Sequence, residues 1–197
     1  MSTPLPPNGH GQSKDLRDLV VSKPAVVCDL DGTIRYNPDG EYINGPDDIA
    51  LFEGVIEALW RYKRKGYLVL GVTNQGGVAH GHKTPGDYQR EMDRTRALAD
   101  QQHSDGWPFD QVKACFYMAS GSVEEYAHRS LLRKPRYGML AVLEHEARLQ
   151  EPKIIIDWEE SMMIGDREED MACAQSAGVT FYPAADWHEE IQKQILE

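Results

Sequence analysis

The chain has 197 residues, with 21 Lys and Arg against 32 Asp and Glu, which gives a formal net charge of −11 at pH 7. This acidity excludes a general basic field for binding nucleic acid or anionic membranes, although it leaves room for a local basic patch. Hydrophobic residues make up 41% and charged residues 27%, a mixture typical of globular proteins and not of disordered or fibrous ones.

The first part of the chain and the cysteines bear on where the protein resides. Residues 1–13 are rich in Pro, Gly, Ser and Asn, and they lack a charged start followed by an apolar run, so we expect a flexible tail and no signal peptide. No apolar stretch reaches the roughly 18 residues that a membrane helix needs. The three cysteines are far apart and lack Cys-x-x-Cys spacing. Together these features predict a cytoplasmic protein with no membrane partner.

Apolar runs of strand length alternate with segments of helical period along the chain. The predicted strands are residues 25–28, 67–72, 112–117, 161–164 and 179–182, and the predicted helices are residues 55–62, 85–104, 139–149 and 168–177. Thr84 and Pro85 form the start signal of the second helix. This alternation predicts an α/β fold, a Rossmann-like three-layer sandwich with a mainly parallel central sheet, and we expect residues 14–197 to form it as a single domain.

Two acidic motifs follow predicted strands, where parallel sheets place their ligands. Asp29 and Asp31 come directly after the first strand, and their spacing in extended chain directs both side chains to the same side. Two carboxylates about 4 Å apart repel by roughly 4 kcal/mol at an effective dielectric constant of about 20, so a cation or a shared proton is required. Asp166 ends the fourth strand, and Asp170 follows one helical turn later. If these ends meet, Asp29, Asp31 and Asp166 form an all-oxygen site suited to Mg²⁺.

Each acidic motif alone also fits a simple helix cap or turn, but both motifs at strand ends in this order favour a site. A phosphate bound there needs further compensation of its charge. Thr73 and Asn74 offer a hydroxyl and an amide at the end of the second strand, and Arg133 and Lys134 offer two cations before Pro135. Arg binds phosphate in a bidentate fork, whereas Lys supplies a compact point charge.

The order of these motifs resembles the haloacid dehalogenase (HAD) superfamily of phosphohydrolases, subfamily IIIA. The matching motifs are Asp29-x-Asp31-Gly32-Thr33, Thr73-Asn74, Lys134 and Gly165-Asp166-x-x-x-Asp170. The resemblance implies a HAD-like fold in which Asp29 attacks phosphorus to form an aspartyl phosphate. It also implies that Asp31 protonates the leaving oxygen and then activates water.

The same resemblance implies roles for the remaining motif residues. Mg²⁺ would be bound by the Asp29 carboxylate, the Asp31 main-chain carbonyl and Asp166. Thr73 and Lys134 would contact the transferring phosphoryl group. Asp170 would support Lys134 or a metal-bound water.

Only about twenty residues separate Gly32 from the helix at Val55, and no sheet-like block lies between Val72 and Val112. We therefore expect a minimal cap, with short loops over the site. Within the superfamily, residues 73–81 and residues 121–125 leading to 133–135 resemble the heptose bisphosphate phosphatases, whose relatives include histidinol-phosphate phosphatases and polynucleotide 3′-phosphatases.

The resemblance to the heptose enzymes implies hydrolysis of the C7 phosphate of D-glycero-D-manno-heptose 1,7-bisphosphate. It also implies contacts to the sugar or the second phosphate from Asn37, Asn74, Arg133 and Arg167. The segment Asn37-Pro38-Asp39-Gly40 is equally a strong turn sequence in its own right.

One feature departs from the heptose enzymes, many of which bind Zn²⁺ through Cys-x-His and Cys-x-Cys pairs. The corresponding positions here are Cys115, Tyr117, Ser130 and Leu132. A structural Zn²⁺ needs four ligands, and a single thiol cannot supply them. We predict no structural zinc and expect this loop to be packed through Phe116, Tyr117, Leu131 and Leu132.

Other functions fit the sequence less well. A polynucleotide phosphatase needs an electrostatic path for the strand, and the basic cluster of Arg61, Lys63, Arg64 and Lys65 at the end of an early helix is better interpreted as a solvated face. A non-catalytic phosphate-binding regulator is disfavoured because every proposed catalytic side chain is present. We expect a monomer that acts on a small phosphorylated substrate and not on nucleic acid.

Overall fold

The computed structural model describes residues 20–196, so the tail predicted at residues 1–13 lies outside the described residues. The elements in chain order are β1 (Val20–Cys28), β2 (Arg35–Tyr36), the 3₁₀ helix η2 (Pro46–Asp48), β3 (Ala50–Leu51), α1 (Val55–Arg64), β4 (Leu68–Asn74), α2 (Gly76–Ala79), α3 (Pro85–Gln102), β5 (Gln111–Cys115), α4 (Gly138–Arg148), β6 (Lys153–Gly165), α5 (Glu168–Ala177), β7 (Thr180–Pro183) and α6 (Ala184–Leu196). No helix in this part of the chain is both long enough and apolar enough to cross a membrane.

The central sheet has five strands in the order β5-β4-β1-β6-β7, and every neighbouring pair is parallel. This confirms the predicted parallel sheet. β1 lies in the middle, with Cys28 paired to Gly71 of β4 on one side and to Ile164 of β6 on the other. The residues that follow these three strands therefore meet at one edge of the sheet.

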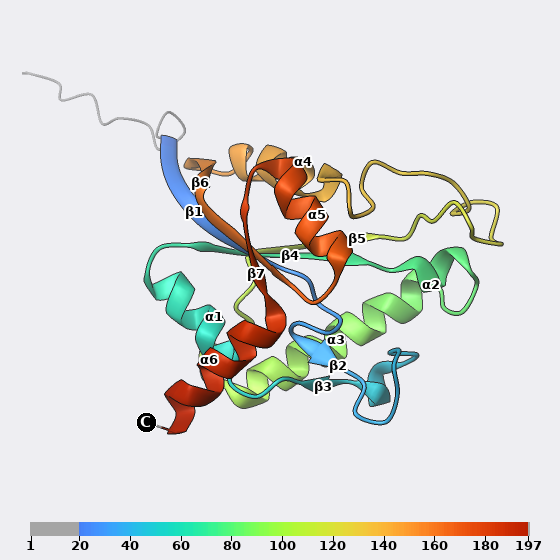
Figure 1. Ribbon diagram of the computed structural model, residues 1–197, viewed down its shortest axis with the longest axis horizontal. Helices are drawn as coiled ribbons and strands as arrows, with labels where there is room; N and C mark the ends of the chain where they lie inside the picture. Colours follow the sequence, from blue (N-terminus) through green and yellow to red (C-terminus); the bar gives the residue numbers. More distant parts are fainter. Residues whose placement is uncertain (1–19, 197) are drawn as a thin grey trace, which may run out of the picture.

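Helices cover both faces of the sheet, which makes the three predicted layers (Figure 1). Side chains alternate along β1, so Val26 and Cys28 pack with α1, α3 and α6, whereas Ala25 and Val27 pack with α4 and α5. Burial of both faces explains why β1 ends in an unbroken apolar run and not in an alternating pattern.

Two strands are longer than predicted. Residues 20–24 of β1 pair with residues 153–157 of β6 and form a two-stranded extension beyond the other strands. We expected β1 to begin after Pro24, since proline cannot donate to a strand ladder. The register shifts between Pro24 and Val26, and the Ala25 amide donates to the Ser161 hydroxyl at 2.8 Å, which accommodates the proline inside the strand.

The segments inserted between the main elements are small. Between the first strand and α1 the chain forms only the antiparallel β2–β3 pair and η2, so the described residues contain the expected minimal cap and no larger one. Residues 76–79 form α2 where we expected a turn.

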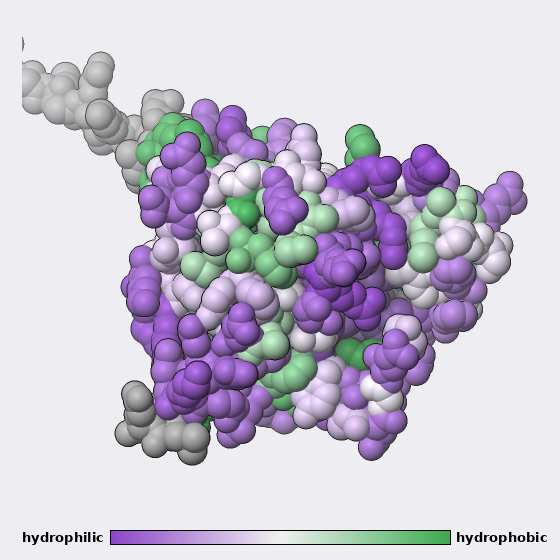
Figure 2. Space-filling model, in the orientation of Figure 1, coloured by the Kyte–Doolittle hydropathy of each residue, from purple (hydrophilic) through white to green (hydrophobic). Residues whose placement is uncertain are grey.

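The face of the molecule that is turned to the viewer in Figure 1 carries mostly hydrophilic side chains (Figure 2).

Helix α6 was not predicted, although it completes one layer. Trp187 and Ile191 of α6 are buried in the same core cluster as α1. We expect Trp187→Ala to lower the free energy of unfolding by about 3–5 kcal/mol, because it leaves a large cavity in this layer. Urea denaturation measures the change, and Ile195→Ala on the exposed side of α6 is the control, expected to cost about 1 kcal/mol or less. Equal losses would show that α6 does not contribute to the core.

Candidate active site

Three buried charged groups meet below the carboxyl end of β1. The Lys134 ammonium donates to Asp29 Oδ1 at 2.5 Å and to the Val72 carbonyl at 3.1 Å, and it lies 2.6 Å from Asp170 Oδ1. Lys134 is 2% exposed and Asp170 is 1% exposed, so water contributes little to their solvation. One ammonium is thus shared between two carboxylates.

Burial disfavours the charged ammonium, but Asp29 and Asp170 outweigh this effect and raise the pKa of Lys134 above its ordinary value. Burial also raises the pKa of Asp29 to about 7, with Lys134 opposing the change and Asp170 and Asp31 reinforcing it. A single positive charge does not neutralise the carboxylates around it, so the site retains an excess of negative charge. A bound cation would remove that excess.

Asp29, Asp166 and Asp170 can each place one carboxylate oxygen within 4.8 Å of the others, an arrangement able to hold a metal ion. Asp170 is already engaged through both oxygens, since Oδ1 lies beside Lys134 and Oδ2 accepts from the Arg167 amide at 3.0 Å. Asp29 and Asp166 are therefore the carboxylates best suited as direct ligands, and the all-oxygen donor set fits Mg²⁺.

The close approach of the loop after β1 to Asp166 depends on the absence of a side chain at Gly32. This residue has a φ of +95°, and a Cβ atom there would lie 2.2 Å from Asp166 Oδ2. The left-handed backbone and the close approach both favour glycine. The loop after β1 can therefore lie directly against the carboxylate of Asp166.

Asp31 is held in a different environment from Asp29. Arg35 Nε donates to Asp31 Oδ1 at 2.6 Å, and Gln75 Nε2 donates to Oδ2 at 2.6 Å. Burial acts to raise the pKa of Asp31, but Arg35 and then Gln75 outweigh it and lower this pKa below its ordinary value. Gln75 also donates to Thr73 Oγ1 at 2.9 Å, which links the two predicted catalytic side chains.

Asn74 holds the backbone of the segment that carries Lys134. Its Oδ1 accepts from the Lys134 amide at 3.1 Å, and its Nδ2 donates to the Lys134 carbonyl at 3.1 Å and to Glu169 at 2.9 Å. The expected contact of Asn74 with substrate stays a prediction, but the observed contacts place Lys134.

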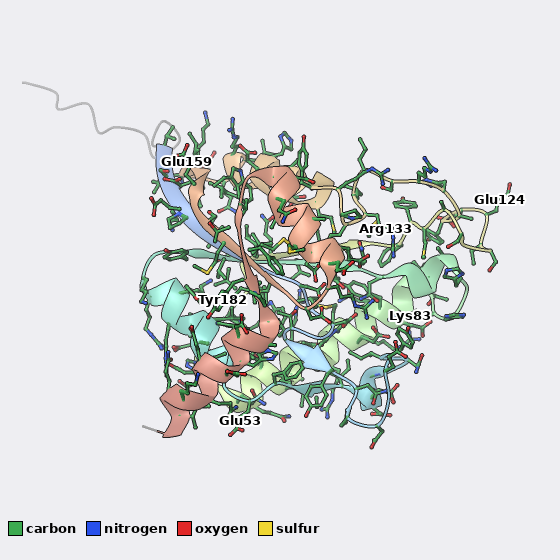
Figure 3. The ribbon with its side chains drawn as sticks, viewed as in Figure 1. Glu53, Lys83, Glu124, Arg133, Glu159 and Tyr182 are labelled. Atoms are coloured by element: carbon green, nitrogen blue, oxygen red, sulfur yellow. The ribbon has the colours of Figure 1, made fainter. Side chains whose placement is uncertain are left out.

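A cavity of about 630 Å³ lies above these groups. The predicted site residues that line it are Asp29, Asp31, Asn37, Thr73, Asn74, Arg133, Asp166, Arg167 and Asp170. Lys134 lies beneath them, buried. Two cations on the cavity wall, Lys83 and Arg133, lie at the same end of the molecule near α2 (Figure 3). The structure thus brings all the predicted site residues to one place.

Two predicted substrate contacts also have local roles. Asn37 accepts from the Asp39 amide at 2.9 Å and donates to the Tyr42 carbonyl at 2.8 Å, as its turn sequence predicts. Arg167 lies 3.8 Å from Asp166, and about half of its side chain is exposed. Both residues line the cavity, so their contact with substrate stays a prediction.

Sequence reasoning missed several polar residues that contact Asp31 directly or through one another. They are Arg35, Gln75, Lys83, Glu91 and Thr95. Glu91 and Thr95 are both 0% exposed, and they lie on the buried face of α3 together with Tyr88, Met92 and Ala99. A charged residue on the apolar stripe of an amphipathic helix was the available signal.

The loop between Cys115 and Leu132 is packed by aromatic contacts. The ring centroids of Tyr117 and His128 are 4.6 Å apart, and those of Tyr117 and Tyr126 are 5.9 Å apart. The prediction for Leu131 was wrong, because its side chain is 75% exposed, whereas Leu132 packs against the core as expected. The loop is packed instead by the rings of Tyr117, Tyr126 and His128, which offer larger contact areas than a leucine side chain.

The basic cluster at the end of α1 is partly compensated by neighbouring acids. Arg61 and Arg64 both pair with Glu57, and Lys63 pairs with Asp110 at 2.7 Å. Two carboxylates thus compensate part of the charge of the four cations, and these exposed or partly exposed pairs support the interpretation of a solvated face.

A family model described as polynucleotide kinase 3 phosphatase matches residues 25–186, which include all the strand-end motifs. The chain belongs to this family of HAD phosphatases. The protein is accordingly a phosphatase, and the resemblance noted from its motifs is confirmed.

Curated relatives and solved structures agree with this assignment. The chain is 35% identical over 159 residues to a D-glycero-beta-D-manno-heptose-1,7-bisphosphate 7-phosphatase of Vibrio cholerae, covering 81% of this chain and 79% of the relative. It is also 35% identical over 162 residues to the Escherichia coli K12 protein of the same name, covering 82% and 78%.

Two crystal structures have a similar fold. A HAD-like protein from Mesorhizobium loti matches with a TM-score of 0.67 and 30% identity, over 80% of this chain and 70% of the other. The D,D-heptose 1,7-bisphosphate phosphatase of B. bronchiseptica, complexed with magnesium and phosphate, matches with a TM-score of 0.62 and 22% identity, over 81% and 78%. These matches confirm the HAD-type fold.

The shared ammonium leads to a prediction about stability. We expect Lys134→Met to lower the free energy of unfolding by about 3–5 kcal/mol in metal-free buffer, because it leaves two buried carboxylates without a partner. Urea denaturation in the presence of EDTA measures the loss. Lys113→Met is the matched control, since Lys113 pairs with Glu146 at 2.6 Å in a partly exposed position and its loss is expected to cost about 1 kcal/mol or less. Similar losses for both variants would contradict the special role of the buried pair.

Proposed function

We propose that the protein is a Mg²⁺-dependent phosphomonoester hydrolase that acts through an aspartyl phosphate on Asp29. The observation that carries this proposal is the buried Asp29 carboxylate at the end of β1, in contact with Lys134 and beside Asp166 and Asp170. A nucleophile held this way faces the cavity while a fixed positive charge lies behind it.

In the first step, an oxygen of Asp29 forms a bond to phosphorus and the bond from phosphorus to the leaving oxygen breaks. Asp31 in its protonated form gives its proton to that leaving oxygen, so an alcohol departs. Lys134 and the Thr73 hydroxyl contact the transferring phosphoryl group and stabilise its negative charge. The product of this step is a phosphoryl group on Asp29.

In the second step, a water molecule attacks phosphorus and transfers a proton to the Asp31 carboxylate. The bond between phosphorus and Asp29 then breaks, which releases phosphate and restores the starting carboxylate. Asp31 therefore acts first as acid and then as base, which requires that it reach both oxygens on the same side of the cavity.

Asp29 and Asp166, together with the Asp31 main-chain carbonyl, would hold Mg²⁺. Bound there, the ion neutralises charge on the phosphoryl oxygens and on the carboxylates. Asp170 stabilises Lys134 beside them.

For the substrate we propose a sugar phosphate, and specifically the C7 phosphate of D-glycero-D-manno-heptose 1,7-bisphosphate. The 35% identical relatives carry that activity in their names. The cavity of about 630 Å³ admits a molecule of this size, and Arg133 and Arg167 offer cations for the sugar or its second phosphate. Histidinol phosphate and a polynucleotide 3′-phosphate are the alternatives, and the formal net charge of −11 disfavours the polynucleotide.

We also make proposals about the domain organisation, cellular location, oligomeric state and partner of the enzyme. We propose that residues 14–197 act as a single domain, that the protein is a cytoplasmic monomer and that its partner is a small phosphorylated molecule.

The role of Asp29 is tested by an isosteric substitution. We expect Asp29→Asn to reduce phosphate release by about 10⁴-fold or more, because the amide cannot attack phosphorus. The fold should persist, since Asp170 still pairs with Lys134. Phosphate release and circular dichroism are measured on the same preparation, with Asp93→Asn on the exposed side of α3 as the matched control. Retained activity in Asp29→Asn would overturn the mechanism.

The substrate and the metal are tested in one assay. Phosphate release is measured with heptose 1,7-bisphosphate, histidinol phosphate and a 3′-phosphorylated oligonucleotide, each after treatment with EDTA and again with added Mg²⁺. We expect the highest kcat/KM with the heptose substrate and activity only with Mg²⁺, because the clustered carboxylates need a hard cation. Preference for another substrate would replace the assignment, and full activity in EDTA would exclude the metal.

A further inference from the structure

We propose that Arg35 is a positioning residue that fixes the direction of the Asp31 carboxylate, and that α3 holds Arg35 in place. This inference rests on the proposed function, since it concerns the proton that Asp31 gives and takes. Arg35 is thereby added to the residues that affect the reaction, together with Thr95 and Glu91, which contact its guanidinium.

The contact between Arg35 and Asp31 is short and directional. Arg35 is fully buried, and its Nε donates to Asp31 Oδ1 at 2.6 Å. Gln75 Nε2 donates to the other carboxylate oxygen of Asp31, Oδ2, also at 2.6 Å. About one third of the Asp31 side chain stays exposed, and this part lines the cavity. The two donors thus hold both carboxylate oxygens from the protein side and leave the cavity side to the substrate.

The far end of the guanidinium is anchored on α3. Arg35 Nη1 donates to Thr95 Oγ1 at 2.8 Å, and Nη2 lies 3.7 Å from Glu91 Oε2. Glu91 in turn accepts from the Lys83 ammonium at 2.9 and 3.0 Å. Negative and positive side chains therefore alternate through Asp31, Arg35, Glu91 and Lys83, and both ends of this row, Asp31 and Lys83, line the cavity.

A role in orientation explains this network better than a role in stability. Buried ion pairs are often no more stable than apolar residues of similar volume, because desolvation cancels their attraction. A guanidinium is a rigid planar fork, so fixing its far end on Thr95 also fixes the direction of its Nε. An ammonium at position 35 cannot contact Asp31 and Thr95 with the same geometry.

The consequence of a misdirected Asp31 depends on the leaving group. An alkoxide leaves only if it receives a proton, whereas p-nitrophenolate is stable enough to leave without one. The value of kcat/KM reports the steps up to transfer of the phosphoryl group to Asp29. Loss of orientation at Asp31 should therefore lower kcat/KM for an alkyl phosphate much more than for p-nitrophenyl phosphate.

The experiment compares kcat/KM for p-nitrophenyl phosphate and for heptose 1,7-bisphosphate, or for the alkyl phosphate that the wild type hydrolyses fastest. We expect Arg35→Lys to lose about 10- to 100-fold with the alkyl substrate and about 3-fold or less with the aryl substrate. Asp31→Asn is the reference for complete loss of proton delivery and should show the same selectivity to a greater extent.

Two further variants separate orientation from folding. Thr95→Val removes the acceptor for Arg35 Nη1 without altering any group that contacts Asp31, and a smaller loss selective for the alkyl substrate is expected. Leu98→Ala is the matched control, because it removes packing of the same helix against the core and leaves Arg35, Thr95, Glu91 and Lys83 in place. Any loss in this control should be equal for both substrates.

Each outcome has a distinct meaning. A selective loss in Arg35→Lys and in Thr95→Val supports the positioning role. An equal loss for both substrates, or no loss, overturns it while the proposed function stands. A wild-type protein that hydrolyses neither substrate with Mg²⁺ overturns the proposed function itself.

Discussion

The active site depends on a single ammonium group placed between two carboxylates in a region that water barely reaches. Lys134 comes from a segment far along the chain from β1, yet it lies within hydrogen-bonding distance of Asp29 and beside Asp170. Removing carboxylates from water is costly unless each has a partner. The sheet register, the Asn74 contacts to the backbone of Lys134 and the position of α5 all serve to bring this charge to the end of β1.

The two aspartates after β1 are only one residue apart, but their surroundings differ. Asp29 lies beside other carboxylates and a shared ammonium, and its pKa is raised. Asp31 faces the Arg35 guanidinium and the Gln75 amide, and its pKa is lowered. Different environments for neighbouring carboxylates are how one site obtains two chemical roles from one residue type. The packing around β1 thus gives two neighbouring carboxylates different electrostatic surroundings.

The small size of the inserts has a chemical consequence. Without a large cap among the described residues, the walls of the cavity come from the β2–β3 region, α2 and the loop before Lys134. That loop is packed by contacts of the Tyr117 ring with the rings of Tyr126 and His128. Arg133 and Lys83 are among the side chains that line this cavity.

Local sequence patterns were enough to predict the α/β class, the parallel sheet and the strand-end motifs, because apolar periodicity and carboxylate spacing can be recognised without the fold. They also indicated that Asp29, Asp31 and Asp166 would converge, since parallel strands end at a common edge. Only the tertiary structure revealed the extension of β1 through Pro24, the packing of α6 and the buried partners of Asp31. Arg35 and Glu91 are far apart in the chain, and no local pattern pairs one with the other. Their role follows from which side of α3 faces the core, and that was decided by the packing of the whole domain.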